Sequence, residues 1–238
     1  MNIPLLEVDG LNAHYEKSHI LHGVSMKVGQ GEIVSLLGRN GSGRSTTLKA
    51  IMGLVRPTGG RVILDGKNVA GERAFRIARS GIAYVPEERE IFANVTVAEN
   101  MRIGMQPPRD GAASWTIDQM FAFFPQLKDR QNTAAGMLSG GEQQMLTMCR
   151  SLLGNPRVIL IDEPTEGLAP KIVDVVTEMI REICNQGVSV VLVEQKLTIA
   201  MRVSKRVYVM GHGKIVFEGT PEALRNAPEV RRNWLEVN

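Results

Sequence analysis

Long apolar runs separated by polar, glycine-rich stretches are the dominant pattern of this chain. The runs Ile33–Leu37, Val158–Ile161 and Val188–Val193 are apolar at all positions except Ser35 and Ser189 and are rich in β-branched residues. Such runs are typical of strands buried on both faces of a parallel sheet, because successive side chains on a strand point to opposite faces. Shorter strands are predicted at Leu5–Val8, Val24–Val28, Arg61–Leu64, Ile82–Val85, Val207–Met210 and Ile215–Phe217.

Helices are predicted between these strands, and capping, proline and glycine signals mark their ends. Thr96-Val97-Ala98-Glu99 has the pattern of a capping box, so one helix is expected to begin at Val97. The other expected helices run from near Arg44 to Gly53, up to Ser80-Gly81, over Trp115–Phe124 before Pro125, from Pro170 to about Asn185 before Gly187, and, as a last short helix, from Thr220-Pro221-Glu222.

These elements predict an α/β fold with a mainly parallel central sheet. A polar, Pro/Gly-rich break at Gln106-Pro107-Pro108-Arg109-Asp110-Gly111 lies inside a mostly helical stretch, which suggests a helical insert over about residues 90–145. His212-Gly213 is expected to form a hairpin turn between the last two strands.

A glycine-rich loop connects the first long apolar strand to the helix that begins near Arg44. Its sequence is Gly38-Arg39-Asn40-Gly41-Ser42-Gly43-Arg44-Ser45-Thr46, which follows the nucleotide-binding pattern G-x-x-x-x-G-K-[ST] at every position except Arg44. Its glycines let backbone N–H groups approach phosphate oxygens, and the hydroxyl of Ser45 can bind Mg²⁺. Such a stretch alone is often only a turn, but a strand before it and a helix after it favour a phosphate loop.

Two adjacent acidic residues, Asp162 and Glu163, follow the second apolar run. They are expected at the carboxyl end of a strand, where open α/β sheets bind their ligands. Asp162 is predicted to hold the Mg²⁺ shell and Glu163 to act as a general base that polarises an attacking water.

Composition excludes only a few classes of binding partner. The 238 residues contain 28 Lys and Arg against 25 Asp and Glu, a net charge of +3, which is too small to indicate nucleic acid. Cys149 and Cys184 have no metal-binding spacing, and both are interpreted as reduced, buried thiols. No apolar run approaches the about 18 residues of a membrane helix, so a soluble chain is expected, with any membrane role through a partner.

A second motif, Leu138-Ser139-Gly140-Gly141-Glu142-Gln143, lies between the phosphate loop and the acidic pair. With those two features it resembles the signature of ATP-binding-cassette (ABC) ATPases. The resemblance spans essentially the whole chain and implies one P-loop ABC ATPase domain over 1–238, with an antiparallel β part, a helical subdomain at about 90–145, and ATP with Mg²⁺ as cofactors.

In ABC ATPases this signature closes over the γ-phosphate held by the opposite subunit. The resemblance therefore implies that Ser139, Gly140 and Gly141 complete a nucleotide site in a second ATPase subunit, in a homodimer or a heterodimer. It also implies that Tyr15, upstream of the first strand pair, stacks on adenine; a buried core tyrosine is the alternative interpretation.

Two further positions are similar to one subfamily. Glu87 stands where most ABC ATPases have the glutamine that links Mg²⁺ and water to the transport partner, and Gln195 stands at the usual switch-histidine position. With Glu166-Gly167-Leu168-Ala169-Pro170, these resemble the ATPases of branched-chain amino-acid importers and their urea and amide relatives. Gln195 cannot titrate, so only a hydrogen bond to the γ-phosphate is expected from it.

The resemblance implies membrane permease subunits as partners, an extracytoplasmic solute-binding protein as an indirect partner, and a peripheral location on the cytoplasmic face of the inner membrane. Two classes stay open: a working transport ATPase, and a weakly hydrolysing regulatory subunit paired with a competent ATPase. A role in translation or DNA repair lacks support, since such ABC proteins usually carry tandem cassettes or large inserts.

Arg44 is the one departure from the phosphate-loop pattern. Lysine there is a compact point charge, whereas arginine is a planar fork that prefers bidentate geometry. Nucleotide binding is expected to survive in weakened form and hydrolysis to fall further, with Glu87 as a candidate partner of the guanidinium.

The helical insert contains more large apolar residues than a small subdomain should need. Docking of a permease loop and packing in a core are both open explanations. The residues concerned are Phe92, Met101, Trp115, Phe121 and Phe124.

Overall fold

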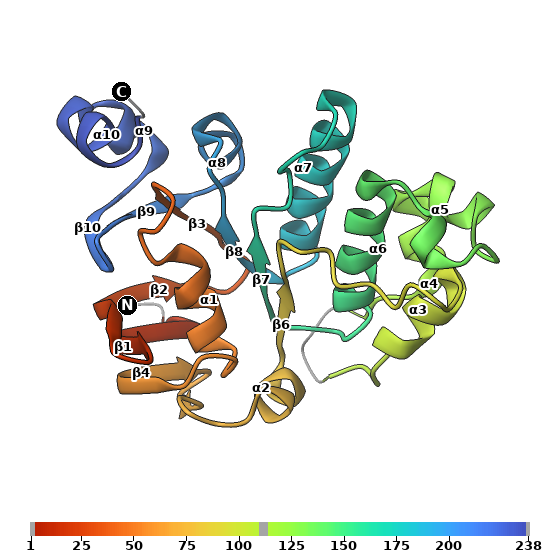
Figure 1. Cartoon of the computed structure of the whole chain (residues 1–238), viewed down its shortest axis with the longest axis horizontal. Coiled ribbons are helices and arrows are strands. Elements are labelled where there is room, and N and C mark those ends of the chain that lie inside the picture. Colours follow the sequence, from red (N-terminus) through yellow and green to blue (C-terminus); the bar gives the residue numbers. More distant parts are fainter. Residues whose placement is uncertain (1–2, 110–113, 237–238) are drawn as a thin grey trace.

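The computed structural model describes residues 3–109 and 114–236. A six-stranded sheet of order β10-β9-β3-β8-β7-β6 crosses the centre of the molecule (Figure 1). All its neighbouring strands are parallel except β9 and β10, which confirms the α/β fold with a mainly parallel sheet. The strands are β3 Ile33–Gly38, β6 Ile82–Val85, β7 Val158–Asp162, β8 Ser189–Val193, β9 Arg206–Gly211 and β10 Lys214–Gly219.

The long apolar strands are buried on both faces, as predicted. On β7, Val158 and Leu160 belong to one apolar cluster and Ile159 and Ile161 to the other. The cluster of Val158 and Leu160 also contains residues of α1 (Arg44–Ile51) and of the antiparallel sheet described below. The cluster of Ile159 and Ile161 contains residues of the helices α3 to α7.

A second, four-stranded antiparallel sheet has the order β2-β1-β4-β5. Its strands are β1 Leu6–Tyr15, β2 Ser18–Val28, β4 Pro57–Leu64 and β5 Lys67–Asn68. The first two strands are longer than predicted. The prediction missed their outer halves because these halves carry polar residues and because the pairing shifts near Gly10, whose φ is +60°. Helix α1 contacts strands of both sheets, so the phosphate loop before it lies at their junction.

Helices α3 to α6 form a group at one side of the molecule (Figure 1). The predicted capping box holds, since the Thr96 hydroxyl accepts from the Glu99 N–H at 3.2 Å and Glu99 Oε2 accepts from the Thr96 N–H at 2.8 Å. The helices not yet given are α2 Ala74–Ser80, α3 Val97–Gly104, α4 Ile117–Phe123, α5 Pro125–Asp129, the 3₁₀ helix η1 Ala135–Met137, α6 Gly140–Leu152, α7 Pro170–Asn185, α8 Leu197–Val203, α9 Pro221–Arg225 and α10 Pro228–Trp234.

Two details of the chain differ from prediction. Pro125 ends α4 but also begins α5, because proline is favourable at the first position of a helix. Helix α9 is not the last, since α10 follows it. Of the predicted polar break, Asp110 and Gly111 lie outside the described residues.

Core packing explains most of the apolar surplus in the helical insert. Met101, Trp115, Phe121 and Phe124 are buried in one cluster, so the docking explanation is wrong for these four. Phe92 is 49% exposed, and docking stays open for it.

The two cysteines differ in burial. Cys149 is fully buried, whereas Cys184 is half-buried and donates to the carbonyl of Gly31 at 3.2 Å, so the interpretation of two buried thiols holds only for the first.

No helix among residues 3–109 and 114–236 has the length and apolar character needed to cross a membrane.

Candidate functional site

The loop between β3 and α1 has a backbone that only glycine permits at its start. Gly38 has a φ of +154°, and a Cβ there would lie 2.6 Å from Ser42 Oγ and 2.7 Å from the Met210 carbonyl oxygen. The loop therefore closes tightly on itself. Ser42 Oγ is buried and has no hydrogen-bond partner among the described residues. Because buried polar groups are normally hydrogen-bonded, this hydroxyl is available to a polar ligand.

The loop forms one wall of a hollow of about 250 Å³. Carboxylates of the loops after β6 and β7 form the other wall. The lining residues are Asn40, Gly41, Ser42, Gly43, Arg44, Ser45, Thr46, Glu87, Glu163 and Glu166.

Ser45 and Asp162, which are far apart in sequence, meet beside this hollow. The Ser45 hydroxyl donates to Asp162 Oδ1 at 3.0 Å, and the Tyr84 hydroxyl donates to Asp162 Oδ2 at 3.1 Å. Burial raises the pKa of Asp162, although these two hydrogen bonds oppose the shift. A hydroxyl and a carboxylate in contact are hard oxygen ligands of the kind that Mg²⁺ takes together with phosphate oxygens.

Arg44 lies inside the site and pairs with the predicted general base. Its Nη2 is 2.7 Å from Glu163 Oε1, and the two side chains are only 5% and 9% exposed. The guanidinium also donates to Asn40 Oδ1 at 3.1 Å and to the Glu194 carbonyl at 3.2 Å. The suggested pairing of Arg44 with Glu87 is therefore wrong in this structure, because the guanidinium donors are directed to other acceptors.

Glu163 is held in an uncommon conformation. Its φ is +43°, a left-handed value that is rare outside glycine and that concentrates at functional sites. Burial raises its pKa to about 7, with Glu166 and Glu87 adding to the shift and Arg44 opposing it. A carboxyl group with a pKa near neutrality suits proton transfer at physiological pH.

Glu87 lines the hollow together with Glu166. Burial raises the pKa of Glu87, and a hydrogen bond between the two carboxyl groups raises it further. Glu87 is nevertheless an exposed residue of the loop after β6, so a role in the site and a solvated loop acid both stay open.

Gln195 and Tyr15 lie outside this lining. Gln195 lines an adjoining hollow of about 340 Å³ that it shares with Gly38, Arg39 and Asn40, so it lies near the other side of the phosphate loop. Tyr15 is 46% exposed, which excludes a buried core role, and it ends β1 within the first strand pair rather than upstream of it.

The signature is at the start of α6, away from the phosphate loop. Ser139 caps the helix: its hydroxyl accepts from the Glu142 N–H at 3.4 Å and donates to Glu142 Oε2 at 2.7 Å. Ser139, Gly140 and Gly141 do not line the hollow, so one chain does not bring the two motifs together.

Three residues of the site were missed from the sequence. Tyr84 supports Asp162, and Thr165 donates to Glu194 Oε1 at 2.6 Å beneath the loop that follows β7. Glu194 directly follows the apolar strand β8, as Asp162 ends β7, and this pattern was a signal that could have found it.

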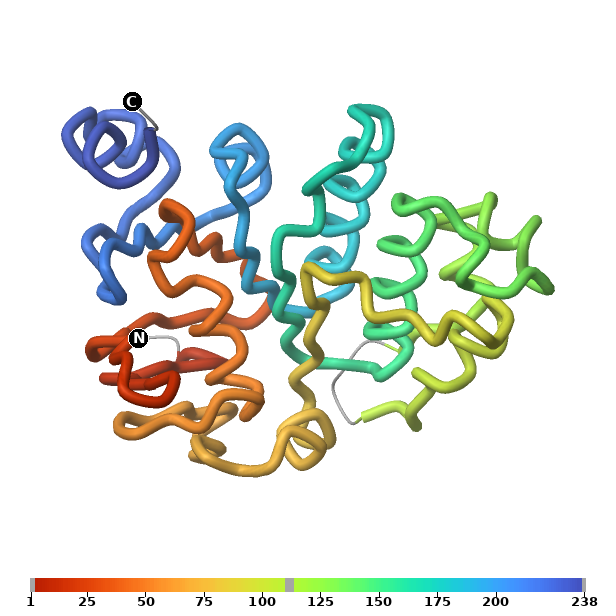
Figure 2. Tube along the Cα trace, viewed as in Figure 1, coloured from red at the N-terminus to blue at the C-terminus, as the bar shows by residue number. Residues whose placement is uncertain are grey.

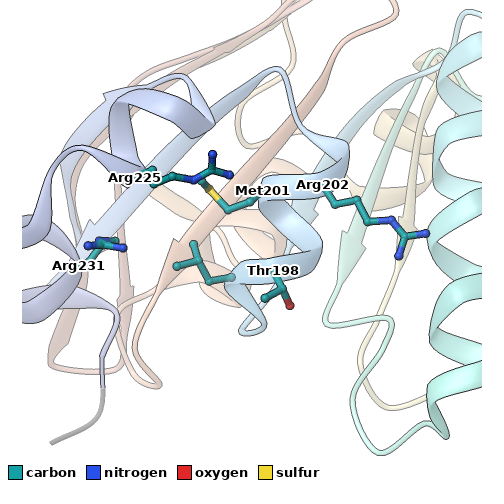
Figure 3. A pocket seen from close by; sticks show the side chains of 6 residues that line it. Thr198, Met201, Arg202, Arg225 and Arg231 are labelled. Atoms are coloured by element: carbon teal, nitrogen blue, oxygen red, sulfur yellow. The ribbon is translucent and has the colours of Figure 1, made fainter.

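A separate hollow of about 340 Å³ lies among α8, α9 and α10 (Figure 3). Its lining is Leu197, Thr198, Met201, Arg202, Arg225 and Arg231. Arg202 points toward α7 in Figure 3 and pairs with Asp174 at 2.9 Å, and none of the phosphate-loop residues lines this hollow.

Comparisons with known proteins agree with this geometry. The family model described as "ABC transporter" matches residues 21–166. The high-affinity branched-chain amino acid transport ATP-binding protein BraG of Pseudomonas aeruginosa is 39% identical over 97% of this chain and 99% of its own length. The probable branched-chain amino acid transport ATP-binding protein LivF of Archaeoglobus fulgidus is 35% identical over 92% of this chain and 94% of its own.

Among solved structures, a nucleotide-free ATP-binding cassette from an ABC transporter superposes with a TM-score of 0.82 at 25% identity. It covers 95% of this chain and 96% of its own. This chain therefore belongs to the ABC transporter family and has the fold of its ATP-binding cassettes, as its phosphate loop, its Ser45–Asp162 contact and its near full-length similarity to such proteins all indicate.

Proposed function

We propose that this chain, as one ABC ATPase domain over residues 1–238, binds and hydrolyses ATP to power import of amino acids, of the branched-chain type, through a membrane permease. The observation that carries the proposal is the contact of Ser45 with Asp162 beside Glu163 and the phosphate loop. The solute class rests on the similarity to BraG and LivF.

In this proposal the backbone N–H groups of residues 38–46 hold the phosphates, and Ser45 and Asp162 hold Mg²⁺. The bound Mg²⁺ neutralises charge that develops on the phosphates. Glu163 accepts a proton from the attacking water, and Gln195 donates a hydrogen bond to the γ-phosphate. Tyr15 stacks on adenine, which gives little selectivity among purines.

In this proposal, Glu163 becomes available as a base only when the γ-phosphate draws the Arg44 guanidinium away from it. While the guanidinium holds Glu163, one oxygen of the carboxylate is engaged and its negative charge is offset, which makes it a weaker base toward water. A γ-phosphate competes for the same guanidinium, because arginine binds phosphate and carboxylate oxygens alike. This arrangement also favours the alternative of a weakly hydrolysing subunit paired with a competent ATPase.

The separation of the signature from the phosphate loop supports a second ATPase subunit, identical or different. Ser139, Gly140 and Gly141 of each chain would close the site of the other. With permease subunits and, indirectly, an extracytoplasmic solute-binding protein, the assembly would place this chain peripherally on the cytoplasmic face of the inner membrane.

An apolar groove of about 560 Å³ supports permease docking. It lies along α2, β6, α3 and α6, and Leu54, Phe75, Phe92 and Ile103 leave apolar surface exposed in it. Figure 2 shows the segment from β6 to α3, which contains Glu87 and Phe92, crossing from the central sheet to the helical group. The Asn100 amide holds this segment by hydrogen bonds to the Phe92 N–H and carbonyl, both at 2.9 Å. A permease that displaces Phe92 in this groove would therefore also shift the segment that carries Glu87.

Photo-crosslinking tests the groove. A benzoyl-phenylalanine in place of Phe92 is expected to crosslink to the permease in the assembled transporter, because it lies in the proposed contact. The same group in place of Val216, a partly exposed apolar residue of β10 outside the groove, is the control and should give no crosslink. An active transporter without crosslinks from Phe92 would contradict docking there.

Reconstitution in proteoliposomes tests the function. With its permease, binding protein and second ATPase subunit, the chain is expected to support ATP-dependent leucine uptake, and Ser45→Ala should abolish uptake by removing a magnesium ligand. The exposed Ser18→Ala is the matched control. Uptake of urea or short amides but not leucine would favour the relatives of that class, and ATP-independent uptake would contradict the proposal.

A further inference from the structure

Three of the four histidines of this chain stack ring against ring on one face of the hairpin formed by β1 and β2. The rings of His14 and His19 lie 4.0 Å apart between centroids at an interplanar angle of 8°. The rings of His19 and His22 are 3.9 Å apart at 48°. His19 is thus the centre of the stack.

Strand pairing produces this cluster. His14 pairs with His19, and Asn12 pairs with His22, so the side chains project from the same face, while Leu11, Ala13 and Leu21 fill the buried face. The His14 ring is hydrogen-bonded to Thr58 Oγ1 at 3.0 Å and the His19 ring to Asn12 Oδ1 at 3.2 Å. The His14 and His19 rings lie face to face rather than converging on one ion, and no group of three or more His, Cys, Asp and Glu side chains that could hold a metal ion occurs in the described part of the chain.

The surroundings of His22 disfavour a positive charge on its ring. Partial burial lowers the pKa of His22, and the charges of His19, Lys214 of β10 and His14 lower it further, whereas a hydrogen bond with the His19 backbone opposes the shift. The neighbours from β4 and β1, Thr58 and Asn12, are uncharged. Because the folded state holds the His22 proton less tightly than the unfolded chain does, the contribution of His22 to stability is lost as pH falls.

The hairpin that carries the stack touches the phosphate loop. The His22 N–H donates to the Gly213 carbonyl at 2.9 Å, and the Gly213 N–H donates to the Ser42 carbonyl at 3.0 Å. Gly213 has a φ of +75°, and a Cβ there would lie 2.7 Å from His22 Cδ2, so the imidazole packs directly on this glycine. Leu21 packs on Gly43 in the same way, since a Cβ at Gly43 would lie 3.0 Å from Leu21 Cδ2.

We propose that the stacked histidines make nucleotide affinity pH-sensitive, because protonation separates the rings and shifts the strand that supports the phosphate loop through Gly213. The inference rests on the proposed function, in that the hollow must bind nucleotide. Affinity for ATP falls as pH falls.

The expected size follows from Coulomb repulsion. Two like charges about 4 Å apart in water repel enough to change an equilibrium constant by about fivefold. Positive imidazoles also attract the phosphates at longer range, which has the opposite sign. That attraction is screened in about 0.3 M KCl, where the Debye length is only about 6 Å.

Calorimetric titration with a non-hydrolysable ATP analogue tests the proposal at about pH 7.5 and about pH 5.8, on either side of the ordinary histidine pKa, in about 0.3 M KCl. His19→Gln removes both stacked pairs and keeps a polar side chain. His212→Asn removes the fourth histidine, which lies outside the stack against Trp234, and is the control. Protonation of the analogue and of Glu163 is common to all variants and cancels.

The wild type and His212→Asn are expected to lose about fivefold more affinity at the lower pH than His19→Gln does. Equal losses in all three proteins would overturn the inference while leaving nucleotide binding intact. No binding by the folded wild type at the higher pH would instead contradict the proposed function. If His19→Gln does not fold, His14→Gln, which removes one outer ring, carries the same comparison.

Discussion

Glu163→Gln is expected to reduce ATP hydrolysis by about 10²–10⁴-fold, the range that general-base catalysis contributes. Glutamine matches the shape of glutamate in this buried position, and its amide oxygen can still accept the hydrogen bond from Arg44. It cannot accept a proton from water. Binding should therefore continue while turnover stops, and an ATP-bound dimer with the native partner subunit should accumulate.

Size-exclusion chromatography with and without ATP and Mg²⁺ measures this dimer. Glu178→Gln, the same change at an exposed position of α7, is the control and should turn over ATP and dissociate normally. If Glu163→Gln and its partner associate no more tightly with ATP than without it, the model of sites shared between two chains is wrong.

Arg44→Lys is expected to raise ATP turnover of the purified assembly by at least a few-fold. A lysine has one ammonium and cannot keep the three contacts that Arg44 makes with Glu163, Asn40 and the Glu194 carbonyl. Glu163 would be released toward water, and the ammonium would reach the phosphates as a point charge. A tenfold gain needs only about 1.4 kcal/mol of improved transition-state contact.

The rival view is that the site has adapted to the guanidinium, with Glu163 as the adapted partner, in which case lysine gains nothing. Steady-state hydrolysis of the wild type and the variant with the same partner separates the two views. Arg61→Lys, the same change in an exposed ion pair with Asp9, controls for the substitution itself. Equal or lower turnover in Arg44→Lys at unchanged thermal stability would show that Arg44 is no handicap.

Local patterns were sufficient to predict most of the fold. β-branched runs identified β3, β7 and β8, since a strand buried on both faces has few other sequence solutions. Glycine, capping and proline signals located the starts of α1, α3 and α7 within a residue or two. The outer halves of β1 and β2 were missed, because their stability comes from pairing with each other rather than from an apolar face.

Contacts between distant residues could not be predicted in this way. Arg44 and Glu163 are 119 positions apart, and nothing near either residue indicates that the guanidinium turns to this carboxylate rather than to Glu87. The burial of Met101 and Phe124 depends likewise on how α3 to α6 pack together, which composition does not reveal. The phosphate loop was recognisable because all its residues are consecutive.

The cap of α6 has a mechanical consequence in the proposed dimer. The Ser139 hydroxyl is already engaged with Glu142, and this cap is worth about 1 kcal/mol to the helix. A γ-phosphate arriving from the partner would have to share or take over that hydroxyl, so closure works against an intact helix end. Once phosphate leaves, the hydrogen bonds of the cap form again, and the free energy that they recover favours separation of the two subunits after each cycle.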